Sequence, residues 1–126
     1  MTRTLAVLLC LLSTHTLAAP PPEGSEDYKI MHPYAQWVTS QHDRLGRWCC
    51  SIADGRPVDA KISPEGHWQV MFQRPETISD DAAQPVPSGW INVPDDAVIK
   101  GANPMGVPIA WWYRGRIQCF CPIGGV

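Results

Sequence analysis

The residues with the clearest capacity for chemistry are four cysteines in two close pairs. The segment "GRWCCS" places Cys49 beside Cys50, and the segment "QCFCP" places Cys119 and Cys121 one residue apart. Cysteines can hold zinc, exchange electrons or form disulfides. Zinc sites usually leave about two to four residues within each pair, and redox sites usually have Cys-x-x-Cys spacing or one exposed reactive thiol. The observed spacings therefore favour structural disulfides.

Disulfide geometry restricts how these four cysteines can pair. Adjacent cysteines would close a small strained ring, and the two side chains of a Cys-x-Cys strand point the same way, about 7 Å apart. We therefore expect two bonds between the Cys49–Cys50 segment and the Cys119–Cys121 segment. Two arrangements remain open: 49–119 with 50–121, or 49–121 with 50–119. Either would tie the end of the predicted helix to the last strand.

Few other residues suggest a reactive site. His42 and Asp43 could form the acid–base pair of a small hydrolase, but no serine or cysteine nucleophile stands in a recognisable motif, and a surface histidine on a helix is the commoner explanation. The acidic pairs at 80–81 and 95–96 lack the alternating oxygen ligands of a calcium loop. We assign no catalytic residue, no metal and no cofactor.

The pair Trp111-Trp112 is a candidate for recognition. Adjacent residues on a strand face opposite ways, so that Trp111 in the core would leave Trp112 on the other face, near Arg114 and Arg116. There Trp112 could stack on a sugar ring or a peptide. It could equally be covered by the helix or by the 74–89 loop. Trp112, Arg114 and Arg116 form the candidate binding face.

The first residues have the features of a secretory signal peptide over 1–19. Arg3 precedes an apolar run from Leu5 to Leu12, and cleavage after Ala18 or Ala19 fits the small residues that follow. The run is too short to span a bilayer, and no second run in the mature part is long enough. With disulfides expected, the protein is predicted to be periplasmic or secreted.

Composition limits the classes of partner. The mature part has about 107 residues, the size of one domain. Its slightly acidic balance and its lack of a Lys/Arg cluster argue against nucleic-acid binding. All six tryptophans lie in the mature part, and they can bury much area in a small core.

Periodicity predicts an α+β fold. Residues 20–30 are Pro-rich and acidic and are expected to form an extended tether, followed by a single domain over 31–126. A helix is predicted over 32–46, with Pro33 in its first turn and Gly46 at its end. Alternating segments predict short strands, and in "HWQVMFQ" the residues Trp68, Val70 and Phe72 are expected on the buried face. Residues 107–122 are predicted to form a hairpin with its tip at 114–115, in which Ile117, Cys119 and Cys121 would share one face of the second strand. The expected architecture is one N-terminal helix packed on a small, mostly antiparallel sheet of four to five strands, stabilised by disulfides.

The segments "HPYAQW", "CCS" with "DGRPV", "GWINVPDDAVIKGANPMG" and "IQCFCPIGG" together resemble a group of small exported proteins of proteobacteria and their phages. These proteins carry a Tyr-x-x-Trp helix, a vicinal Cys pair and a C-terminal Cys-Phe motif. The resemblance implies export and implies no particular activity. Many members have a cysteine where Gly55 stands, which together with the presence of Cys121 suggests a different disulfide arrangement here.

These observations lead to three functional hypotheses. The first is a non-catalytic cell-envelope or extracellular binding module whose partner is a glycan, peptidoglycan or an envelope protein. The second is a small hydrolase that uses His42 and Asp43. The third is a structural component of an envelope or virion.

Overall fold

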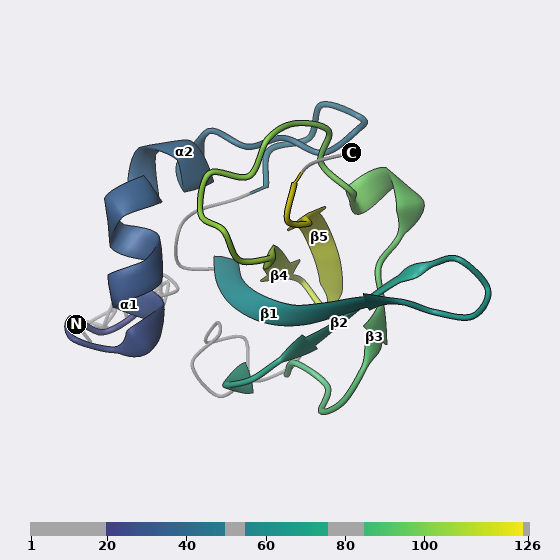
Figure 1. Cartoon of the computed structure of the whole chain (residues 1–126), viewed down its shortest axis with the longest axis horizontal. Helices are drawn as coiled ribbons and strands as arrows, with labels where there is room; N and C mark the ends of the chain where they lie inside the picture. The colour runs from purple at the N-terminus through teal and green to yellow at the C-terminus, as the bar shows by residue number, and fades with distance from the viewer. Residues whose placement is uncertain (1–19, 50–54, 76–84, 125–126) are drawn as a thin grey trace, which may run out of the picture.

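The computed structural model describes residues 20–49, 55–75 and 85–124, which form short helices and a five-stranded antiparallel sheet (Figure 1). The signal peptide predicted over 1–19 lies outside these ranges. The helical elements are α1 (Glu26–Met31), the 3-10 helix η1 (His32–Tyr34) and α2 (Ala35–Thr39), with a further 3-10 turn, η3 (Asp95–Ala97). The strands are β1 (Gly55–Ile62), β2 (Trp68–Phe72), β3 (Ile91–Asn92), β4 (Ile109–Tyr113) and β5 (Arg116–Cys121). The α+β class and the five strands agree with the prediction.

The helical region begins earlier than predicted, because Ser25 caps it. The Ser25 hydroxyl accepts a hydrogen bond from the backbone N–H of Tyr28 at 3.1 Å, and Glu26 and Asp27 place negative charge in the first turn. Helix α1 therefore occupies part of the segment 20–30, so the prediction of an extended tether over that whole segment is wrong.

The helical region also ends earlier than predicted, at Thr39. The Thr39 hydroxyl donates back to the Ala35 carbonyl at 3.0 Å, and the Ser40 hydroxyl donates to the Trp37 carbonyl at 2.8 Å. Such side-chain bonds compete with the helical hydrogen bonds and favour termination. Gly46 has a positive φ of 76°, as expected of a stop residue, but it closes a later turn.

Strand β1 joins the two parts of the sheet, whose strand order is β3-β2-β1-β4-β5. Its first residues, from Gly55 to Pro57, pair with β4, and those from Val58 to Ile62 pair with β2. The sheet curls as it passes from one partner to the other (Figure 1). The far edge of β5 is met by a parallel bridge between Val98 and Phe120.

The β4–β5 hairpin has the predicted tip at Arg114 and Gly115, both with positive φ, as a tight hairpin turn requires. The register shifts between Trp111 and Trp112, because Trp111 pairs with Cys119 whereas Trp112 pairs with Ile117. This bulge turns Ile117 to the face opposite Cys119 and Cys121, and the expectation that all three share one face is wrong.

Two clusters of buried side chains lie on the two faces of this hairpin. The first fills the inside of the curled sheet, where Val70 and Phe72 of β2 meet Trp112 and Phe120. The second contains Met31 of α1 and Val38 of α2, together with Trp111 and neighbouring hairpin residues. Both faces of β4 are therefore covered, and four of its five residues are buried.

A buried ion pair also links the helical region to the sheet. The Asp27 carboxylate of α1 lies 3.7 Å from the Arg56 Nε of β1 and contacts the Arg74 guanidinium. Arg56 is nearly fully buried, and it donates a further bond to the Gly55 carbonyl at 2.7 Å. Burying charge is costly without such partners, which explains why Asp27 of α1 faces Arg56 of β1. None of the helices in the described ranges is long and apolar enough to cross a bilayer.

Candidate binding face and its supporting disulfide

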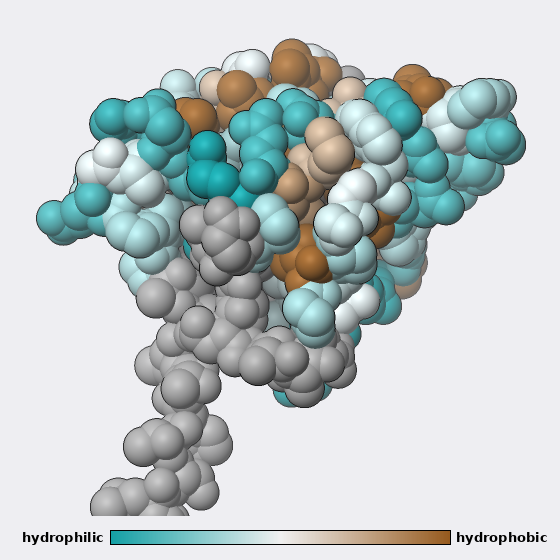
Figure 2. Space-filling model, turned by 90° about the horizontal axis from the view of Figure 1, so that it is seen from below, coloured by the Kyte–Doolittle hydropathy of each residue, from teal (hydrophilic) through white to brown (hydrophobic). Residues whose placement is uncertain are grey.

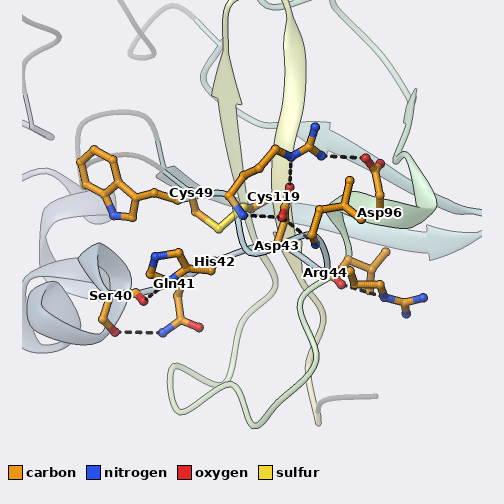
Figure 3. Close-up of a disulfide and its surroundings, with 12 residues drawn as sticks. Ser40, Gln41, His42, Asp43, Arg44, Cys49, Asp96 and Cys119 are labelled. Carbon is orange, nitrogen blue, oxygen red and sulfur yellow. Dashed lines mark hydrogen bonds and ion pairs between the residues drawn. A yellow bond between two sulfur atoms is a disulfide. The ribbon is translucent and has the colours of Figure 1, made fainter.

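The disulfide joins Cys49 to Cys119, with 5.5 Å between their Cα atoms (Figure 3). It ties the segment after α2 to β5, as predicted, and both residues are fully buried. Of the two arrangements left open by the sequence, this bond belongs to 49–119 with 50–121. Cys50 lies outside the described residues.

Cys121 is a free, fully buried thiol, which corrects the prediction that it forms a second disulfide. It shares the second apolar cluster with Cys119, two residues earlier on the same face of β5. Burial raises the pKa of the Cys121 thiol to about 11, because the apolar surroundings disfavour the thiolate. The nucleophilic form is therefore scarce at neutral pH, and the residue acts as a packing group.

A braced turn leads from α2 to the disulfide. The Asp43 carboxylate accepts bonds from the backbone N–H groups of Leu45 and Arg47, each at 2.9 Å, and from Arg47 Nε at 2.6 Å. Arg47 also bridges to Asp96 at 2.6 Å (Figure 3). Burial alone raises the pKa of Asp43, but the bonds from Arg47 and Leu45 and the charge of Arg47 outweigh it, and the pKa lies below its ordinary value.

These contacts show that His42 and Asp43 do not act together. His42 Nδ1 lies 2.9 Å from the Ser40 carbonyl, whereas the Asp43 carboxylate is held by Arg47 and Leu45. Figure 3 shows the His42 ring beside Ser40 and Gln41, away from the Asp43 carboxylate. The geometry does not support this pair as an acid–base site. In the described ranges, no three His, Cys, Asp or Glu side chains come together as a metal site requires.

The face predicted around Trp112, Arg114 and Arg116 needs correction, because only 5% of Trp112 is exposed. Trp112 packs inside the curled sheet, with its ring centroid 6.4 Å from that of Phe72. Adjacent residues do face opposite ways, but each face of β4 has its own apolar cluster. Arg114 and Arg116 are exposed, and the exposed aromatic ring beside them is Tyr113, with Arg114 5.2 Å from its centroid.

A second pair of an aromatic ring and a cation lies on the outer face of β1, β2 and β3. Trp90, immediately before β3, is 41% exposed, and Lys61 Nζ of β1 lies 4.0 Å from the centroid of its ring. A cation over an indole face is a favourable contact. It also fixes the position of Trp90, whose neighbours are the turn residues Ser88 and Gly89.

Strand alternation sets a row of polar side chains beside this pair. Lys61 is opposite Gln69, and Gln69 is opposite Asn92, so that the row crosses all three strands. Gln69 Nε2 donates to Asn92 Oδ1 at 2.8 Å. We call these four residues, Lys61, Gln69, Trp90 and Asn92, the Lys61–Trp90 face.

The residues next to each member of the row face inward. Ala60, Val70 and Ile91 belong to or pack against the first apolar cluster, as the two-residue period of a strand requires. The alternation in "HWQVMFQ" correctly predicts that Val70 and Phe72 are buried, whereas Trp68 is only partly buried against the same cluster. The pairing of Gln69 with Lys61 and Asn92 depends on long-range register, and no sequence signal gives it.

The comparisons with known proteins give no family. No protein-family model matches the chain. Neither the curated proteins nor the solved structures contain a significant match.

Proposed function

We propose that the protein is an exported, disulfide-stabilised, non-catalytic binding module, which recognises a cell-envelope or extracellular glycan through the Lys61–Trp90 face. The observation that carries the proposal is an exposed indole ring, held by Lys61 and set beside an exposed amide pair. A partly exposed indole offers a large apolar area with few rotatable bonds. The flanking amides supply oriented hydrogen bonds, as sites for polar ligands require.

Export is supported by the signal-like first 19 residues and by the Cys49–Cys119 bond, since disulfides persist in oxidising compartments. The location of the disulfide also suits a binding role. It lies in the second apolar cluster, whereas the Lys61–Trp90 face covers the outer side of the first. Stabilisation and recognition are thus assigned to different parts of the fold.

Cosedimentation with insoluble glycans tests this function. Wild-type protein is mixed with purified peptidoglycan sacculi or with mucin-coated beads, and the bound fraction is measured. The substitution Trp90→Ala is expected to weaken binding about tenfold, because the stacking area is worth on the order of 1 kcal/mol. Circular dichroism checks that the variant is folded.

The matched control is Tyr113→Ala, which removes another exposed aromatic ring that contacts a cation. This variant is expected to bind like the wild type. Loss of binding in Tyr113→Ala with normal binding in Trp90→Ala would place the site at the hairpin tip. Failure of the wild type to bind either material contradicts the proposal and favours a structural role in an envelope or virion.

A further inference from the structure

The amide pair on the Lys61–Trp90 face presents complementary hydrogen-bonding groups. The bond from Gln69 Nε2 to Asn92 Oδ1 leaves the Gln69 carbonyl oxygen as an acceptor and the Asn92 amino group as a donor. Among the described residues, neither group has a protein partner in a hydrogen bond. One acceptor beside one donor matches the N–H and C=O of an acetamido group.

Lys61 adds a positive charge to the same row. Its ammonium group has three donors and no acceptor, and its side chain is exposed. Its Nζ lies 4.0 Å from the centroid of the Trp90 ring, and this contact with a neutral ring leaves the positive charge available to an anionic group of a ligand. A carboxylate on the ligand would form a charge-assisted hydrogen bond with it.

The size and surroundings of the row restrict the ligand further. Lys61 lies one strand spacing, about 5 Å, from Gln69 and two spacings, about 10 Å, from Asn92, so that one sugar residue with two polar substituents can reach across the row. The acidic balance of the chain, 12 Asp and Glu against 10 Lys and Arg, does not favour a polyanion. A single indole flanked by polar groups also suits a sugar better than a protein partner, because the core of a protein interface is more apolar.

We propose that the Lys61–Trp90 face binds a glycan that carries both an acetamido group and a carboxylate. The C–H face of a sugar ring stacks on the exposed part of the Trp90 indole that Lys61 does not cover. The acetamido group bonds to Gln69 and Asn92, and the carboxylate bonds to Lys61. This inference rests on the proposed function, and two acidic amino sugars have the required chemistry: N-acetylmuramic acid of peptidoglycan and N-acetylneuraminic acid of animal glycans.

Titration with soluble sugars, followed by ¹H–¹⁵N NMR, tests the ligand class. The indole peak of Trp90 is identified by its absence from the spectrum of Trp90→Phe. N-acetylmuramic acid and N-acetylneuraminic acid are the two probes, and the stronger one identifies the source. N-acetylglucosamine has only the acetamido group, glucuronic acid has only the carboxylate, and glucose has neither. At least one acidic amino sugar is expected to bind about tenfold more tightly than any of these three controls.

Variants separate the two contacts. Lys61→Gln is expected to weaken binding of the acidic amino sugar about tenfold and to leave N-acetylglucosamine unaffected, whereas Lys61→Arg retains the charge and restores binding. Asn92→Ala is expected to weaken binding of the acidic amino sugar and of N-acetylglucosamine and to leave binding of glucuronic acid unaffected. Equal binding of glucose and of the acidic amino sugars overturns the inference.

The two proposals can fail separately. If cosedimentation depends on Trp90 but the sugars are not discriminated, the ligand class is wrong and the binding function stands. If neither cosedimentation nor the sugar titrations depend on Trp90, both proposals are wrong. Binding of unglycosylated peptides to the same indole would show that the partner is a protein and not a glycan.

Discussion

Removing the Cys49–Cys119 bond is expected to remove a large part of the free energy of unfolding. The two residues are separated by 70 positions, so the bond closes a long loop in the unfolded chain. The chain-entropy relation values such a loop at about 4 kcal/mol. Small domains have total unfolding free energies of about 5–15 kcal/mol, and the loss would therefore leave the fold marginal.

The test compares urea unfolding of two variants in a Cys50→Ala background, in which no other pairing can replace the bond. One variant combines Cys49→Ala with Cys119→Ala. The control is Cys121→Ala, which removes a sulfur atom from the same apolar cluster without breaking a bond. Subtracting twice the control loss corrects for the two buried sulfur atoms.

The expected remainder is about 4 kcal/mol in unfolding free energy, together with a larger m-value because the uncrosslinked chain exposes more surface when unfolded. A remainder below about 1 kcal/mol would refute the assignment of loop-closure stabilisation to this bond.

Two further predictions concern the braced turn and the approach of β1 to β4. Asp43→Asn should lower stability at pH 7 by about 1 kcal/mol, since it removes the charge opposite Arg47. Folding lowers the pKa of Asp43. The contribution of Asp43 to stability is therefore complete above its pKa in the unfolded chain, about 3.9, and is lost as the pH falls below that value. Equal loss of stability in the wild type and the variant between pH 5 and 3 would contradict this. Gly55→Ala should lower the free energy of unfolding by about 1–3 kcal/mol, because the new Cβ would lie 3.0 Å from Trp111 Nε1. An unchanged midpoint of urea unfolding would contradict this and would show that the indole can shift without cost.

The sequence predicted the strands well where burial follows a local pattern. Alternation in β2 identified Val70 and Phe72 as core residues, and the Arg114-Gly115 pair identified the hairpin tip. Each of these features depends on residues within a few positions of one another. The cysteine spacing also led to the correct link between two distant segments, because geometry made the local pairings unfavourable.

The helix limits were wrong because two local signals competed. Pro33 suits a first helical turn, but Ser25, eight residues before it, provides a stronger start together with Glu26 and Asp27. At the other end, the glycine at 46 predicts a helix stop, and its positive φ fits that role. It closes a turn in which its N–H donates to the Asp43 carbonyl at 3.0 Å, and the sequence does not show that the chain has already left the helix.

The sequence predicted the type of candidate site but not the residues that form it. The sequence indicated an aromatic ring beside a cation, but Trp112 is covered because the sheet curls over it, and curling depends on how β1 divides its pairing between β2 and β4. Trp90 and Lys61 are 29 residues apart in the chain, and their contact depends on strand register. Figure 2 shows one face of the molecule where apolar side chains lie among polar ones, so that surface hydropathy alone does not identify a site.

The most direct test of the central claim is the fraction of protein that cosediments with peptidoglycan sacculi or mucin-coated beads. The account predicts binding by the wild type and by Tyr113→Ala, and a loss of about tenfold in affinity for Trp90→Ala. Equal binding of Trp90→Ala and the wild type would contradict it.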